Sequence, residues 1–230
     1  MGECDLVFVD APHFETDLPM SINIRTKVRY EYSYIESAVI KLGEETLEVG
    51  SWGEYFLNGV EGAILPSTIA GYPITKTMES EKQHKFAIHI TDDEIIELKT
   101  FKDWVSVVLH GADQRRYFGS SGMIGNYDKH GKLIGRDGVT EFEDVNAFAA
   151  EWQIRQDESM LFQTARLPQH PQECVLPSAK KTQRRLGETI AMEAAEKACQ
   201  KAGWSKGTIQ MCIHDVMATG DLEVAEAGAM

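Results

Sequence analysis

The stretch GSSGMIGNYDKHGKLIGRDG, residues 119–138, carries side chains that could bind a metal ion. Asn126, Asp128 and Asp137 place hard oxygen donors among six glycines. Calcium takes six to eight oxygens at about 2.3 to 2.6 Å from a loop that can bend around the ion. The spacing of an EF-hand is absent, and Asn, Asp and Gly are also the usual turn formers. Spacing alone therefore favours a plain turn, with a calcium loop as the alternative.

Other kinds of chemistry find less support in this stretch and elsewhere. The glycines lack the GK[ST] ending of a phosphate-binding loop and the strand–helix setting of a dinucleotide fingerprint. The segment GSSG, residues 119–122, does not match the G-x-S-x-G nucleophile turn. His214 and Asp215 are neighbours in a predicted helix and cannot face each other. We therefore expect no catalytic and no cofactor-binding residues, which favours a non-catalytic role while leaving an enzyme open.

Composition restricts the partners. The formal net charge of -13, from 36 acidic and 23 basic residues, repels phosphate backbones, so no nucleic-acid partner is expected. The basic segment KKTQRR, residues 180–185, is predicted to be a solvated linker. Apolar runs are too short for a membrane span. Residues 1–15 lack a basic n-region and a long apolar run, so no signal peptide is expected there.

The four cysteines allow several states. Cys4, Cys174, Cys199 and Cys212 form no CxxC pair, so a structural zinc site is not expected. They could form two disulfides in three connectivities, or remain reduced. We predict a disulfide between Cys199 and Cys212, because a closed loop of that length contributes about 3 kcal/mol in the chain-entropy model. That would help a segment too small to build its own core.

Hydrophobic periodicity predicts a mainly β domain followed by helices. From residue 21 to 34 the even positions are apolar or aromatic, apart from Thr26, and the odd ones polar, as in a strand or pair of strands with one buried face. Short strands are predicted at 38–42, 46–49, 55–57, 85–91, 94–98 and 104–109, which favours an antiparallel sandwich or meander. The predicted organisation is a β domain over 1–154, a proline-containing linker over 155–187 and a helical, cysteine-bearing tail over 188–230. The first tail helix is expected to present one face formed by Ile190, Ala194, Ala198 and Ala202.

Four segments resemble, in the right order, the von Willebrand factor type D domain. They are PHFET, VIKLGEETLEVGSWGEYFLNGV, GMIGNYDKHGKLIGRDG and FEDVNAFAAEWQI, and the similarity covers about residues 4–154. The tail is similar to a reduced form of the cysteine-rich helical module that often follows this domain. The resemblance implies an antiparallel β fold and a calcium site in which Asp17, Asn126 and Asp128 supply side-chain oxygens. The backbone carbonyl of His130 would add a fourth ligand, and Asp137 a further one.

The chain also departs from the family pattern. Ile124 stands where the family has a loop cysteine, so Cys4, which resembles its usual partner, lacks that bridge. Asp10, Ala11, Pro12 and His13 replace the family's Asp-Pro-His, which removes the labile Asp-Pro bond. Gly131 and Lys132 stand where the family often has two further oxygen donors, and a lysine would oppose a divalent ion. We therefore expect calcium to bind weakly or not at all.

The resemblance implies a non-catalytic extracellular or secretory-pathway module that serves structure, adhesion or assembly. Its expected partners are other proteins or further copies of itself. The alternative is a small-molecule-binding or oxidative enzyme built on the same scaffold, because ostracod luciferases carry domains of this kind. A deep apolar pocket with shifted titratable groups would favour that alternative.

Overall fold

The computed structural model describes residues 2–15, 18–29, 32–124, 131–166, 174 and 190–227. The fold is mainly β with antiparallel sheets, and short helices follow near the C-terminus, which confirms the predicted fold class. The chain divides into two compact units. We call them the β unit, which holds α1 and the sheets apart from residues 28–32, and the helical unit, which holds α2, α3 and α4.

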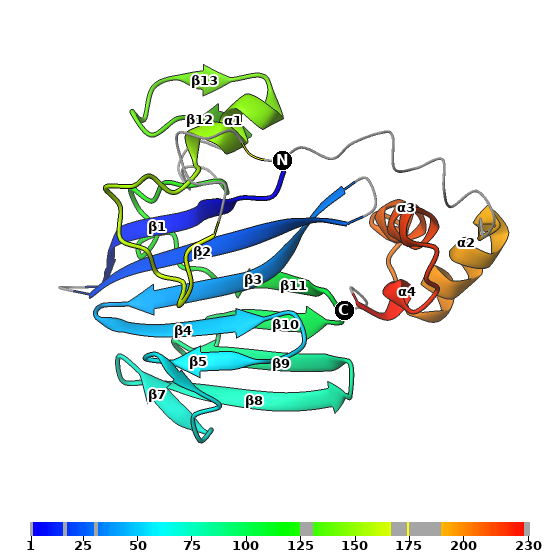
Figure 1. Ribbon diagram of the computed structural model, residues 1–230, viewed down its shortest axis with the longest axis horizontal. Helices are drawn as coiled ribbons and strands as arrows, with labels where there is room; N and C mark the ends of the chain where they lie inside the picture. Colours follow the sequence, from blue (N-terminus) through cyan, green and yellow to red (C-terminus); the bar gives the residue numbers. More distant parts are fainter. Residues whose placement is uncertain are drawn as a thin grey trace. The chain divides into compact units, whose positions relative to one another are not determined.

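The first sheet of the β unit has six strands in sequence order, so each strand lies beside its chain neighbours (Figure 1). The described part of the predicted alternating segment lies in the two neighbouring strands β2 and β3 of this sheet. The strands are β1 (Asp5–Glu15), β2 (Leu18–Arg29), β3 (Tyr32–Leu42), β4 (Glu45–Gly50), β5 (Tyr55–Leu57) and β6 (Val60–Glu61).

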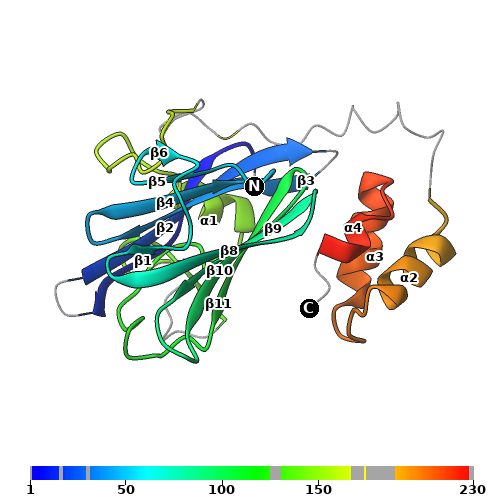
Figure 2. The same cartoon turned by 90° about the horizontal axis from the view of Figure 1, so that it is seen from below.

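The second sheet has five strands in the order β11-β10-β9-β8-β7, and Figure 2 shows the two sheets as separate layers. Its strands are β7 (Ser67–Ile69), β8 (Tyr72–Ser80), β9 (Gln83–His89), β10 (Ile95–Phe101) and β11 (Trp104–His110). Two further short strands, β12 (Leu133–Ile134) and β13 (Glu141–Phe142), pair with each other ahead of helix α1 (Val145–Glu151). Sequence periodicity had not predicted β1, β8 or α1.

The main core lies between the two sheets. Met20, Ile22 and Ile24 of β2 are buried in one cluster with Phe86 and Ile88 of β9. The even positions of β2 thus form a buried face, as the alternation predicted. Apolar side chains from both sheets leave water together, which is the main force that holds such a sandwich closed.

The opposite face of the six-stranded sheet is also covered, which the sequence did not predict. Asn23 and Arg25 occupy odd positions of β2, yet they are only 5% and 8% exposed. A second apolar cluster lies on this face and joins strands β1 and β3 to α1 and the segment after it: Val7, Val39, Phe148, Trp152, Ile154 and Phe162. The prediction of one wet face is therefore wrong here, because segments from far along the chain form a third layer.

The segment 155–166 belongs to this third layer, although the sequence predicted a linker from residue 155 onward. Phe162 is buried, and the guanidinium of Arg25 lies 4.4 Å from the centre of its ring. The backbone N–H of Gln163 donates a hydrogen bond of 2.8 Å to Glu48 of β4. The β unit therefore extends past the predicted boundary at residue 154, and most of the predicted linker after residue 166 lies outside the described residues.

The helical unit contains α2 (Met192–Lys201), α3 (Ile209–Thr219) and α4 (Val224–Ala227). The predicted disulfide between Cys199 and Cys212 is present and joins α2 to α3. The buried face of α2 is formed by Ala195 and Cys199, while Ala194 is exposed, so the predicted apolar face is displaced by one position. Within the described part of the chain, no helix is long and apolar enough to cross a membrane.

Candidate functional site

The structure describes one of the five predicted calcium ligands. Asp17, Asn126, Asp128 and His130 lie outside the described residues, so their assignment stays a prediction. Asp137 is described, and its carboxylate caps a turn. It accepts hydrogen bonds from the backbone N–H groups of Val139 and Thr140, at 2.9 and 2.8 Å, and from the Thr140 hydroxyl. These hydrogen bonds, led by the one from the hydroxyl, lower the pKa of Asp137 to about 2.

The residues before the undescribed loop pair with the edge of β1. Ser121 and Asp10 exchange two backbone hydrogen bonds, of 2.8 and 2.9 Å, and Met123 donates to the carbonyl of Val7. Gly122 lies between them at φ +121°, and a Cβ there would stand 2.6 Å from the carbonyl oxygen of Phe8. Within the glycine-rich stretch of residues 119–138, Gly122 at least is required for the close approach of two backbone segments.

The residues after the loop are held by a local ion pair. The Lys132 ammonium lies 2.5 Å from a carboxylate oxygen of Glu141 in β13. Across all the described residues, no three His, Cys, Asp or Glu side chains are grouped as a metal site would require. The described part of the glycine-rich stretch therefore consists of an edge pairing and a capped turn.

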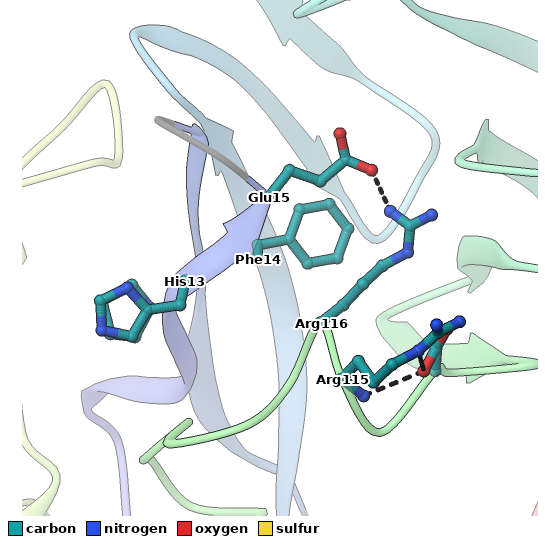
Figure 3. A pocket seen from close by; sticks show the side chains of 7 residues that line it. His13, Phe14, Glu15, Arg115 and Arg116 are labelled. Carbon is teal, nitrogen blue, oxygen red and sulfur yellow. Dashed lines mark hydrogen bonds and ion pairs between the residues drawn. The ribbon is translucent and has the colours of Figure 1, made fainter.

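An open depression of about 760 Å³ lies at the end of β1 (Figure 3). Figure 3 shows Glu15 pointing toward Arg116, while the His13 ring is turned away from both arginines. Arg116 forms ion pairs with Glu15 and with Glu94, whose carboxylate oxygen lies 2.9 Å from Nε. Beside it, Arg115 pairs with Asp113 at 2.6 Å.

Burial and ion pairing at this cluster shift the pKa values of three of its groups. Burial raises the pKa of Glu94, although Arg116 opposes the shift. Burial, together with a hydrogen bond to the Glu15 carboxylate, raises the pKa of Tyr72 to about 12. The hydrogen bond from Arg115 lowers the pKa of Asp113 to about 2. Arg116 thus ties the end of β1 and the start of β10 to the turn that follows β11, and we call this cluster the Arg116 clamp.

A second charged cluster fixes the beginning of β1 on the outer face. Arg25 forms two hydrogen bonds of 2.7 Å with the carboxylate of Asp5 and a third, also 2.7 Å, with the backbone carbonyl of Thr164. Glu48 lies near this pair, and burial raises its pKa despite the hydrogen bond that it accepts from Gln163. These contacts hold the third layer on the sheet. The charges are paired and hydrogen-bonded, because an unpaired buried charge would cost much free energy.

A disulfide between Cys4 and Cys174 completes this end of the unit, across a sequence separation of 170 residues. The family resemblance implied only that Cys4 lacks its usual partner, and the structure supplies a different one. Among the described residues no cysteine is free. Two disulfides are consistent with an oxidising, non-cytosolic environment.

Sequence reasoning missed both charged clusters. Glu15 and Arg116 are 101 residues apart, and Arg25 and Thr164 are 139 apart, so no local spacing links them.

A comparison with models of known protein families gives no match for this chain, and a comparison with curated protein sequences gives none either.

Proposed function

We propose that this chain is a non-catalytic module of an extracellular or secretory-pathway protein, of the von Willebrand factor type D kind, and that it serves adhesion or assembly. The observation that carries the proposal is the Cys4–Cys174 disulfide, which closes the β unit between the first strand and a segment 170 residues later. Such a cross-link persists in oxidising compartments and is rare in the cytosol.

The charged groups at the depression beside the end of β1 also support a structural role. An enzyme needs a nucleophile, acid or base that is available to a substrate. In the depression at the end of β1, the acidic groups are instead paired with Arg115 or Arg116. The ion pairs of Arg116 hold the end of β1 and the start of β10 against the turn that follows β11, which is a structural role.

Calcium belongs to this proposal as a weak ligand of the loop around Asn126 and Asp128. A thermal melt of the full chain, with millimolar calcium or with chelator, measures it. We expect at most a small calcium-dependent rise in melting temperature, and Asp128→Ala should abolish it. A large rise that Asp128→Ala removes would contradict the expectation of weak binding and show a strong site.

Self-association tests the assembly role. Sedimentation velocity of the oxidised full chain over a range of concentrations should show a reversible increase in mass. The matched control is the same chain after reduction, which should lose the association together with the disulfides. A chain that stays monomeric at every concentration would refute self-assembly and leave adhesion to another protein as the remaining form of the proposal.

A further inference from the structure

The five-stranded sheet ends at β11, whose outer edge has no partner strand in the described part of the chain. β11 (Trp104–His110) pairs with β10 along all seven of its residues without a bulge, and it is the last strand of the sheet (Figure 2). No isolated bridge or further backbone hydrogen bond joins its other side to another described segment. Such an edge presents a row of backbone N–H and C=O groups to which another strand can pair.

The other sheet edges are short, covered or charged. The backbone of Ser121 pairs with Asp10 on the edge of β1, and β6 has only two residues. β7 has three residues, and on the neighbouring β8 the Lys76 ammonium lies 4.7 and 5.0 Å from the ring centres of Tyr55 and Phe86. An inward-pointing charge of this kind is a usual protection against the addition of a strand.

β11 has none of these protections. Its sequence, WVSVVLH, contains no acidic residue, no lysine or arginine and no proline, and three of its seven residues are valine. We infer that β11 pairs antiparallel with β11 of a second copy of this chain, in a register centred on Val107. The pairing joins the two five-stranded sheets into one continuous sheet. It rests on the self-assembly proposed above, for which it names the surface.

The inner face of β11 is complementary to itself in this register. Val105 is buried in the main core, and Val107 and Leu109 pack against that core. With Val107 opposite its own copy, Val105 of each chain lies opposite Leu109 of the other. The apolar inner face therefore continues from one sheet into the next, and apolar cross-strand pairs of this kind stabilise a sheet.

The outer face introduces no like charges in the same register. Ser106 of each copy lies opposite Val108 of the other, and Trp104 lies opposite His110. Because the pairing is antiparallel and symmetric, the whole strand overlaps and the open edges of both copies are satisfied together.

The flanks of β11 also fit a second copy. The turn before the strand carries Lys102 and Asp103, and the turn after it carries the ion pair of Asp113 and Arg115. An antiparallel arrangement brings the first turn of each chain toward the second turn of the other, and neither group has a net charge. A basic partner attracted by the overall charge of -13 would find no acidic side chain on β11 to recognise.

Sedimentation velocity of the oxidised full chain and of Ser106→Lys/Val108→Lys tests the pairing. The parent chain should dimerise with a dissociation constant in the micromolar range, because one short strand buries a small interface. The variant places lysine opposite lysine twice, which should raise the dissociation constant about tenfold or more. General repulsion cannot explain such a loss, since two added lysines bring the net charge of -13 closer to zero.

Two matched variants identify the surface and its register. Ser106→Glu/Val108→Lys places glutamate opposite lysine twice and should associate at least as tightly as the parent chain. In a register centred on residue 106 or 108, the same variant would oppose like charges and dissociate. Val60→Lys/Val139→Lys adds the same charge at positions that are 59% and 75% exposed outside β11, and it should associate like the parent chain.

Hydrogen exchange of the parent chain gives a readout that needs no substitution. The amides of β11 should exchange more slowly at concentrations above the association midpoint than below it. Association retained by Ser106→Lys/Val108→Lys, lost in Ser106→Glu/Val108→Lys, or without added protection of β11 would overturn the pairing alone. A parent chain that stays monomeric at every concentration would overturn the pairing together with the self-assembly role.

Discussion

Removing the Cys4–Cys174 disulfide should destabilise the β unit more than removing the Cys199–Cys212 disulfide destabilises the helical unit. In the chain-entropy model the contribution of a disulfide grows with the logarithm of the loop that it closes. The separation of 170 residues gives about 5 kcal/mol, against about 3 kcal/mol for the 13 residues between Cys199 and Cys212. Residual structure in the denatured chain makes both figures upper values.

The assay is urea denaturation of Cys4→Ala/Cys174→Ala, followed by tryptophan fluorescence in a Trp204→Phe background. Trp204 belongs to the helical unit, where its Nε1 donates a hydrogen bond of 2.6 Å to the carbonyl of Ala225. Without it, the fluorescence reports on the β unit through its own tryptophans. The free energy of unfolding of that unit should fall by about 3 to 5 kcal/mol.

The matched control is Cys199→Ala/Cys212→Ala in the same background. It should leave the fluorescence transition of the β unit in place and reduce the helical circular-dichroism signal. A β-unit transition that moves by less than about 1 kcal/mol in Cys4→Ala/Cys174→Ala would refute the reasoning, because the longest loop would then contribute least.

Three further substitutions test the packing of the β unit. Arg116→Met should lower the free energy of unfolding by about 3 kcal/mol, because it leaves a buried carboxylate without its cation, while Arg115→Met at an exposed pair should leave the melting temperature unchanged. Gly122→Ala should cost about 3 kcal/mol in urea denaturation, because its Cβ meets the β1 backbone, and Gly119→Ala, where the Cβ meets nothing within 4 Å, only about 1 kcal/mol. Glu48→Gln tests the raised pKa of that carboxyl: the folded chain holds its proton more tightly than the unfolded chain, so stability falls as pH rises from the ordinary carboxyl pKa through the raised one. The glutamine variant should show no such fall and a higher urea midpoint at neutral pH, and equal pH profiles would contradict this.

The alternation of apolar and polar residues predicted burial correctly on the strand face that packs against the other sheet. The alternation along β2 identified its inner face, because side chains two apart point to the same side of a strand. The same pattern failed at Asn23 and Arg25, because their cover comes from residues more than 120 positions later. Helix α1 has seven residues, too few for periodicity, but its N-cap carried a signal: Asp144 accepts a hydrogen bond of 2.7 Å from the N–H of Ala147.

The candidate sites were likewise predictable only where their residues lie close together in the sequence. The Cys199–Cys212 disulfide was predictable because the two cysteines lie close in sequence on neighbouring short helices. The Cys4 partner stayed open, since a separation of 170 residues leaves no trace in local spacing. The hollow on the outer face of the six-stranded sheet combines strands β1 to β3 with a third layer that the sequence did not predict, so its lining residues could not be recognised as neighbours.

Peptide mapping without reduction, on full chain exported through an oxidising secretory pathway, tests the central claim most directly. The account predicts two linked peptide pairs, Cys4 with Cys174 and Cys199 with Cys212, and no free thiol in the folded protein. Recovery of folded protein in which Cys4 and Cys174 are free thiols, or are paired with cysteines of the helical unit, would contradict it.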